Sequence, residues 1–166
     1  MNFLLRPFTL TDAVSFHNHS QNPKVLEKMA YGFPVTLDAV RTTLAKMMQM
    51  DGRTALIRAV DIEGNAVGSI GIFLQGDSDP HNAELAYWLA EPYWGQGIMP
   101  AAIQQICDMA FVKFPIQRVF ARPYAFNTPS RRVLEKAGFI LESEFPHGSA
   151  KNGVQVDATI YATYRK

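Results

Sequence analysis

The chain has 166 residues, of which 48% are hydrophobic and 19% charged, so it suits one globular domain and is not intrinsically disordered. Its formal net charge of +1 gives no general attraction to nucleic acid or to an anionic membrane, and neither is expected as a partner. No apolar run approaches the roughly 18 residues that span a bilayer. The start, MNFLLRPFTLTDAV, lacks the features of a signal peptide, and the single Cys107 allows no internal disulfide, so a cytoplasmic protein is expected.

The first fifty residues are predicted to form a strand and two helices. FLLRPFTLTDA reads as a strand that leads into a helix capped by Thr11 or Asp12. Thr36 is placed to cap a second helix. The apolar residues of that helix recur at helical spacing: Leu37, Val40, Leu44 and Met47.

The middle of the chain is predicted to be a run of strands. Residues 54–60 and 66–74 have strand character, and the turn sequence DIEGN between them predicts a hairpin. A polar loop follows at 76–82. Residues 83–89 form the next strand, with AELAYWL as its sequence.

The last third is predicted to alternate helices and strands. A helix over 100–114 precedes a strand at 118–122, and a short helix begins near Asn127 and stops at Gly138. Residues 139–144 and 154–164 are expected to close the fold as an antiparallel pair. The order of elements predicts one α/β domain over 1–166, with a mixed sheet and at least one parallel crossover.

Two glycines and a proline separate the strand at 83–89 from the helix that follows. Gly95 and Gly97 allow close backbone approach and positive φ, and Pro100 fits a first helical turn, where its missing N–H costs nothing. A helix N-terminus after such a loop can bind a phosphate or pyrophosphate. An ordinary turn is the alternative. No Lys-Ser or Lys-Thr follows the glycines, which excludes a P-loop, and the third glycine of a dinucleotide fingerprint is absent.

AELAYWLAEPYWGQGIMPAAI, followed about thirty residues later by NTPSRRVLEKAGFILES, resembles the GNAT family of N-acetyltransferases, and within it the RimJ and RimL ribosomal-protein-alanine branch. LRPFTLTDA, DIEGNAVGSIGI and DATIYA also match, so the resemblance spans the chain in order. It implies a central mixed, mostly antiparallel twisted sheet of about seven strands, flanked by about four helices. It also implies an acetyl-CoA-dependent enzyme that acetylates a primary amine by direct attack in a ternary complex.

The resemblance implies the cofactor contacts. Pyrophosphate would bind main-chain N–H groups at the turn into the helix: Trp94, Gly95, Gln96, Gly97, Ile98 and Met99. Pro100, which has no N–H, follows them as a further expected cofactor-binding position. The family pattern begins with Gln or Arg and ends with Gly or Ala, whereas this chain has Trp94 and Met99 there. Those departures remove a possible charged contact. The pantetheine arm would pair with the strand edge at Tyr87, Trp88 and Leu89 and would bind Asn127.

Three residues are candidates for the chemistry. Glu84 is the candidate base, with a structural salt bridge or a solvated strand edge as the alternative, and Asp157 is a second candidate. Many family members protonate the departing thiolate with a tyrosine seven residues after the asparagine, but here that position is Leu134. The RimL-like branch suggests Ser130 instead. The alternative is a helix-start serine that bonds only to the backbone.

Other features have simpler interpretations. Cys107 lies among apolar residues of a predicted helix and is expected to be a buried packing residue rather than a nucleophile. The four histidines show no metal-ligand spacing, so no metal is expected. The aromatic residues around 87–94 could line a cavity or pack a core. Substrate specificity is expected to come from residues 20–36 and 146–153.

Two other functions stay open beside the enzyme. One is a non-catalytic acyl-CoA-binding sensor with the same fold, and the other is an unrelated protein that uses the loop to bind a mononucleotide. The amine acceptor and the preferred short acyl group cannot be read from the sequence. The oligomeric state is also open, although the resemblance suggests a homodimer.

Overall fold

A computed structural model describes residues 1–29 and 32–166. Residues 30–31, within the segment expected to influence specificity, lie outside the described residues. The strands are β1 (Leu4–Arg6), β2 (Ala55–Ile62), β3 (Asn65–Leu74), β4 (Asn82–Leu89), β5 (Arg118–Ala121), β6 (Ile140–Lys151) and β7 (Val154–Tyr164). The helices are α1 (Ala13–Ser20), α2 (Pro23–Leu26), α3 (Leu37–Met50), α4 (Ile98–Lys113) and α5 (Thr128–Lys136), with 3-10 turns η1 (Leu10–Asp12) and η2 (Glu91–Tyr93).

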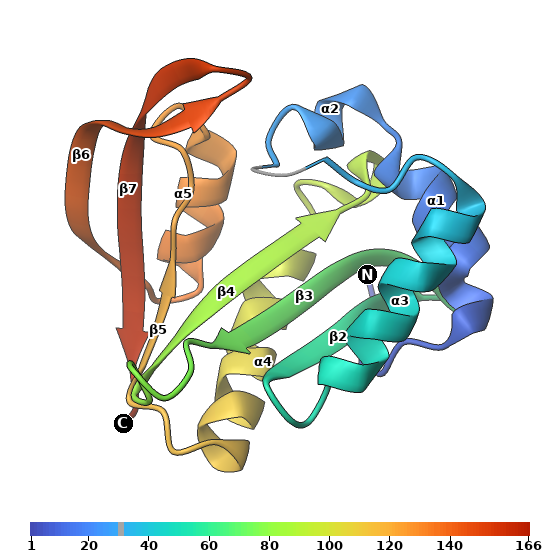
Figure 1. Ribbon diagram of the computed structural model, residues 1–166, viewed down its shortest axis with the longest axis horizontal. Helices are drawn as coiled ribbons and strands as arrows, with labels where there is room; N and C mark the ends of the chain where they lie inside the picture. Colours follow the sequence, from blue (N-terminus) through green and yellow to red (C-terminus); the bar gives the residue numbers. More distant parts are fainter. Residues whose placement is uncertain (30–31) are drawn as a thin grey trace.

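The described strands form one seven-stranded sheet in the order β1-β2-β3-β4-β5-β7-β6. Its neighbours are antiparallel except β4 and β5, which are parallel because the chain returns through α4. Figure 1 shows α1 and α3 on one face of the sheet and α4 on the other. This arrangement confirms the predicted mixed, mostly antiparallel α/β fold, and the short α2 adds a helix to the four expected.

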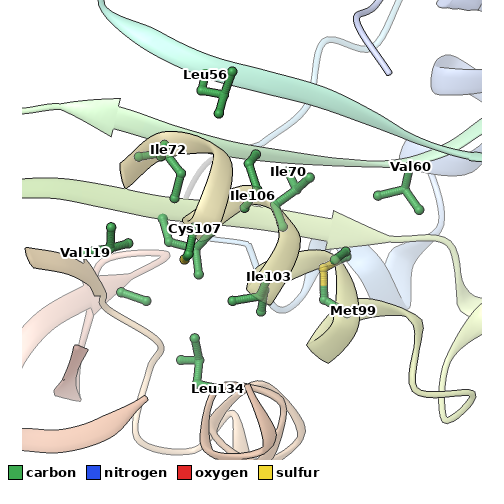
Figure 2. Close-up of a cluster of buried hydrophobic side chains, with 14 of the residues drawn as sticks. Leu56, Val60, Ile70, Ile72, Met99, Ile103, Ile106, Cys107, Val119 and Leu134 are labelled. Atoms are coloured by element: carbon green, nitrogen blue, oxygen red, sulfur yellow. The ribbon is translucent and has the colours of Figure 1, made fainter. Parts of the chain in front are cut away.

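The larger core lies between the sheet and α4 (Figure 2). Ile103, Ile106 and Cys107 of α4 pack against Ile70 and other strand residues, and each is at most 5% exposed. A second cluster on the opposite face joins α1 and α3 to the sheet. Leu134 of α5 is fully buried in the larger core, so its position serves packing and offers no proton donor.

The interpretation of Cys107 as a packing residue is confirmed by its burial. Burial raises the pKa of Cys107 to about 12, and the negative charge of Asp108 adds to the shift. Thiolate fraction falls tenfold for each pKa unit, so at pH 8 the thiol should react with an aromatic disulfide reagent about a thousandfold more slowly in the native protein than in urea. Rapid labelling of the native protein would place Cys107 at the surface.

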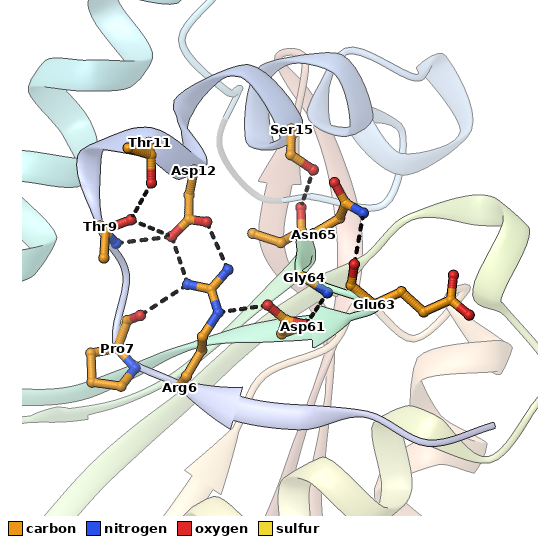
Figure 3. Close-up of polar contacts among 11 residues, drawn as sticks. Arg6, Pro7, Thr9, Thr11, Asp12, Ser15, Asp61, Glu63, Gly64 and Asn65 are labelled. Carbon is orange, nitrogen blue, oxygen red and sulfur yellow. Dashed lines mark hydrogen bonds and ion pairs between the residues drawn. The ribbon is translucent and has the colours of Figure 1, made fainter.

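The N-terminal helix is anchored by a polar network (Figure 3). Arg6 donates from Nε to Asp61 at 2.6 Å and from Nη1 and Nη2 to Asp12 at 2.8 and 2.7 Å. Asp12 is the N-cap residue of α1, which was one of the two predicted positions, Thr11 being the other. Its carboxylate makes no capping hydrogen bond to α1 and instead accepts from Arg6 and from the Thr9 N–H. The network joins β1, β2 and α1.

Two elements differ most usefully from the predicted boundaries, while the other shared elements differ by at most two residues. The strand expected at 139–144 continues as β6 to Lys151, because register shifts after Leu141 and Phe145 let it keep pairing with β7 past Pro146. The helix expected from Pro100 begins at Ile98, with Gly97 as its N-cap. Pro100 therefore lies in the first turn, as its missing N–H requires.

Candidate active site

β4 and β5 are the only parallel strand pair in the described sheet, and they diverge after a short paired stretch. β4 and β5 pair over three positions, which end at Glu84 and Phe120. β4 then continues to Leu89 paired with β3, while β5 ends at Ala121. Figure 1 shows the two strands diverging from this point. The divergence, called the splay below, leaves the β5-facing edge of β4 without a strand partner over residues 85–89.

The main-chain groups along this edge can be assigned from the ladder. The Ala90 N–H donates to the Val67 carbonyl oxygen at 2.8 Å, and Trp88 continues the same register against β3. Since hydrogen-bonded pairs alternate along an antiparallel ladder, even-numbered residues of β4 direct their main-chain groups toward β3. The Leu85 N–H serves the parallel pairing of Glu84 with Phe120, so the Leu85 C=O and both main-chain groups of Tyr87 face the splay, where an extended ligand could pair with them.

The glycine loop leads from the end of β4 into α4. Gly95 and Gly97 have φ values of 72° and 75°, a left-handed conformation that glycine adopts without strain. Gly97 is the N-cap of the 16-residue α4, so the N–H groups of Ile98 and Met99 lie in the turn that has no intrahelical acceptors. This end of the helix carries partial positive charge and suits an anion.

The loop side chains make contacts that the sequence pattern did not show. Trp94, where the family has Gln or Arg, donates from Nε1 to the Leu89 carbonyl oxygen at 2.7 Å. The Lys28 ammonium lies 4.6 Å from the centroid of the Trp94 ring. Gln96 donates to the Pro92 carbonyl oxygen. A lysine remote in sequence thus brings a positive charge to the loop, although residue 94 itself carries none.

Helix α2 is tied to the turn before this loop. Asn22 and Lys24 both donate to the carboxylate of Glu91, at 2.8 and 2.5 Å. Their hydrogen bonds, that of Lys24 first, lower the pKa of Glu91. These contacts keep α2, and with it the segment that carries Lys28, beside the glycine loop.

Ser130 and Asn127 lie at the start of α5, next to the edge of β4. Asn127 is 7% exposed, and its Oδ1 accepts a hydrogen bond from the Ser130 N–H at 3.3 Å. The Ser130 hydroxyl lies 2.6 Å from the hydroxyl of Tyr87, a contact that links α5 to β4. The Ser130 side chain therefore does not bond only to the backbone. No sequence signal pointed to its pairing with Tyr87.

Glu84 lies at the closed end of the splay, on the face of β4 opposite the Tyr87 side chain, because side chains alternate along a strand. Both its carboxylate oxygens accept hydrogen bonds from Arg122, at 2.9 and 3.0 Å. The Glu84 side chain is 25% exposed and that of Arg122 58% exposed. The salt bridge expected as an alternative is therefore present, in a position that solvent reaches.

Asp157, the second candidate base, lies on β7. Its Oδ1 accepts a hydrogen bond from the His147 N–H at 2.9 Å, at a residue of β6 with a φ of 55°. Its carbonyl oxygen accepts from the Ala125 N–H. The first contact holds the irregular part of the β6–β7 pair, and the second ties β7 to the segment before α5.

Four side chains of the expected cofactor site belong to the core. Trp88 packs edge-on against Phe16 and Phe33, and Leu89, Ile98 and Met99 are each at most 8% exposed. Any cofactor contact by these residues would have to come from the main chain. Among the described residues no three His, Cys, Asp or Glu side chains come together as a metal site requires. None of the described helices is both long and apolar enough to span a membrane.

A sheet that diverges between two parallel strands, next to a glycine-capped helix, fits the acyl-CoA N-acyltransferase class that the sequence resemblance implied. Residues 2–140 match the acetyltransferase (GNAT) domain family, so this chain belongs to that family, and the expected N-acetyltransferase class is confirmed. It is 29% identical over 168 residues to the SPbeta prophage-derived uncharacterized N-acetyltransferase YokL of Bacillus subtilis, over 99% of this chain and 91% of YokL.

Further relatives have more specific names. The ribosomal-protein-serine acetyltransferase of Escherichia coli is 30% identical over 95 residues, which are 56% of this chain and 53% of that protein. The fold matches the microcin C7 self-immunity acetyltransferase MccE in complex with acetyl-CoA and AMP, with a TM-score of 0.87, 21% identity and coverage of 98% and 92%. It also matches RimL in complex with coenzyme A, with a TM-score of 0.88, 20% identity and coverage of 99% and 94%.

Gly97→Asp should weaken acetyl-CoA binding by at least about tenfold, or about 1.4 kcal/mol, as measured by titration calorimetry. A Cβ at Gly97 meets no atom within 4 Å, so the added carboxylate would lie in the open space before α4, where pyrophosphate is expected. Gly97→Asn is the matched control, since it has the same size and similar tolerance of positive φ but no charge. Unchanged affinity in a folded Gly97→Asp protein would refute the assignment of the loop.

Proposed function

We propose that this protein transfers the acetyl group of acetyl-CoA to a primary amine by direct attack in a ternary complex, as one domain over 1–166. The observation that carries the proposal is the splay. It brings an unpaired strand edge, a glycine-capped helix N-terminus and the Ser130 hydroxyl together in one region.

The cofactor contacts are proposed along this region. Main-chain N–H groups at the start of α4 bind pyrophosphate, and the Lys28 ammonium adds positive charge nearby. The pantetheine amides pair with main-chain groups of β4 around Tyr87. Asn127 contributes its side-chain amide, while its Oδ1 caps α5. The acetyl-CoA bound by MccE supports the choice of cofactor.

The chemistry requires a base on the amine and a donor to the sulfur. A primary alkyl amine resembles lysine, whose pKa is about 10.4, so holding it neutral near pH 7 costs about 4 to 5 kcal/mol. Glu84 is proposed to take the amine proton, directly or through water, and Ser130 to give a proton to the departing thiolate. The two side chains belong to opposite faces of the splay, which lets the amine attack from one face while the sulfur leaves on the other.

The acceptor is proposed to be either a protein N-terminus or a small-molecule amine. RimL, described as a ribosomal L7/L12 alpha-N-protein acetyltransferase, favours a protein N-terminus, whereas the name of MccE associates the same fold with self immunity to microcin C7. Both acceptors present a primary amine to the same chemistry. The proposed location is the cytoplasm, and a homodimer is the proposed assembly.

A non-catalytic acyl-CoA sensor is the second candidate, and one observation favours it. Both oxygens of the candidate base are already engaged by Arg122. A sensor would bind acetyl-CoA and raise the melting temperature of the protein without releasing CoA in the presence of any amine.

A paired measurement tests the proposal. Thermal unfolding with acetyl-CoA, ATP or NAD should show stabilisation by acetyl-CoA. A thiol-release assay over amines and N-terminal peptides should then identify at least one substrate. Stabilisation without thiol release supports the sensor, and stabilisation by ATP or NAD but not by acetyl-CoA would overturn both candidates.

A further inference from the structure

The contact between Tyr87 and Ser130 joins two side chains from different elements at the proposed leaving-group side of the splay. Their hydroxyl oxygens are 2.6 Å apart, and either one could be the donor. The Tyr87 hydroxyl also lies 3.4 Å from the Ser130 carbonyl oxygen. A contact of 2.6 Å is short for two neutral hydroxyls and fixes both side chains relative to each other.

The chemistry of the two groups favours Tyr87 as the donor in this pair, because a phenolic hydroxyl is more acidic than an aliphatic one. Burial raises the pKa of Tyr87 to about 12, against a smaller opposing effect of the hydrogen bond to Ser130, so the phenol keeps its proton at working pH. Asn127 already caps the Ser130 N–H. The serine hydroxyl is therefore not needed as a helix cap and is held by Tyr87 beside the strand edge where pantetheine is proposed to lie.

We propose that Tyr87 is a positioning residue that donates its phenolic hydrogen bond to Ser130 Oγ and so turns the proton of Ser130 toward the departing sulfur. This inference rests on the proposed function. It concerns the phenol hydroxyl, which is separate from the proposed main-chain pairing of Tyr87 with pantetheine. In a chain of two hydroxyls, the first bond polarises the second and strengthens it as a donor.

The acetyl transfer forms one bond and breaks one, and two protons move. The amine nitrogen forms a bond to the thioester carbon, and the C–S bond breaks with its electron pair left on sulfur. The proton of Ser130 moves to the sulfur, and the hydrogen bond from Tyr87 stabilises the charge that develops on Oγ. The proton that the amine gave up restores the Ser130 hydroxyl through solvent, so the products are the acetylated amine and free CoA thiol.

A double-mutant cycle tests the pairing with Tyr87→Phe, Ser130→Ala and the double variant on one competent amine. Phenylalanine fills the same space and keeps the main chain, so acetyl-CoA affinity and thermal midpoint should stay near those of the wild type. Tyr87→Phe should lower kcat about five- to tenfold, with little change in KM for the amine. In the Ser130→Ala background the same substitution should change kcat by less than about twofold, because nothing remains to be positioned.

Tyr164→Phe is the matched control, because Tyr164 is 48% exposed at the end of β7 and bonds to Glu142. It should turn over like the wild type. An equal effect of Tyr87→Phe in both backgrounds, or no effect in either, would overturn the inference while leaving the proposed function intact. A Ser130→Ala protein with the wild-type rate would overturn the donor assignment as well. A wild type that binds acetyl-CoA but acetylates no amine overturns the proposed function together with the inference.

Discussion

Glu84→Gln should lower kcat by at least about a hundredfold, the lower end of what general acid–base steps contribute, while acetyl-CoA affinity barely changes. Glutamine keeps the shape of the side chain but cannot take the proton of the amine. Raising the pH should partly restore the rate, because solution then supplies more neutral amine. A pH–rate profile of kcat for the variant and the wild type on one amine measures both effects.

Arg122→Gln separates loss of a base from loss of an ion pair. Both Glu84→Gln and Arg122→Gln remove the ion pair: glutamine at 84 keeps one acceptor oxygen but no charge, and glutamine at 122 lacks the guanidinium that makes both hydrogen bonds. An exposed ion pair contributes about 0 to 1 kcal/mol, so neither variant should unfold. Arg122→Gln leaves the carboxylate in place and should lower kcat far less than Glu84→Gln. Equal losses of kcat in the two variants, without recovery at high pH, would show that the Glu84–Arg122 ion pair has only a structural role. The general base would then be Asp157, an ordered water or a group on the substrate.

Ser130→Ala should also lower kcat by about a hundredfold, but without alkaline rescue. Added hydroxide supplies neutral amine and does not replace the missing donor to the sulfur. The same series of pH–rate profiles separates this behaviour from that of Glu84→Gln, and titration calorimetry with acetyl-CoA checks that the cofactor still binds.

Ser130→Thr is the matched control for this prediction, since it keeps a hydroxyl on the same carbon. It should retain most of the activity that Ser130→Ala loses. A wild-type pH–rate profile for Ser130→Ala would contradict the assignment of Ser130 as the proton donor. Its hydroxyl would then have only a structural role, through its contact with Tyr87.

Elements with strong local signals were predicted correctly. The cap at Thr36 and the helical spacing from Leu37 to Met47 gave α3, whose Thr36 side chain accepts from the Ala39 N–H. The turn at Glu63 and Gly64, both with positive φ, joins β2 and β3 as a hairpin. In such segments local propensity and tertiary packing favour the same structure.

Elements without a regular apolar pattern were not predicted, or were predicted too short. Helix α2 has four residues, too few for a helical pattern, although Asn22 before Pro23 marks its start and caps it. Strand β6 is longer than its pattern predicts, because Pro146 and Gly148 interrupt the alternation of apolar residues. The pairing with β7 and a shift in register carry the strand past them.

The candidate site was predictable as a set of residues but not as a set of contacts. The glycine loop and the start of α5 carry recognisable motifs. In contrast, the bond of Ser130 to Tyr87 and the two bonds of Glu84 to Arg122 join residues 43 and 38 positions apart. Such contacts depend on strand register and on the divergence of β4 from β5, which no local pattern records.

Transfer of an isotopically labelled acetyl group tests the central claim most directly. Wild-type protein is incubated with labelled acetyl-CoA and a panel of amines and N-terminal peptides, and the acceptors are analysed by mass spectrometry. We expect one labelled acetyl group on the nitrogen of at least one primary amine, with the release of an equal amount of CoA. Acceptors that remain unlabelled while the protein binds acetyl-CoA tightly would contradict the proposed acetyl transfer.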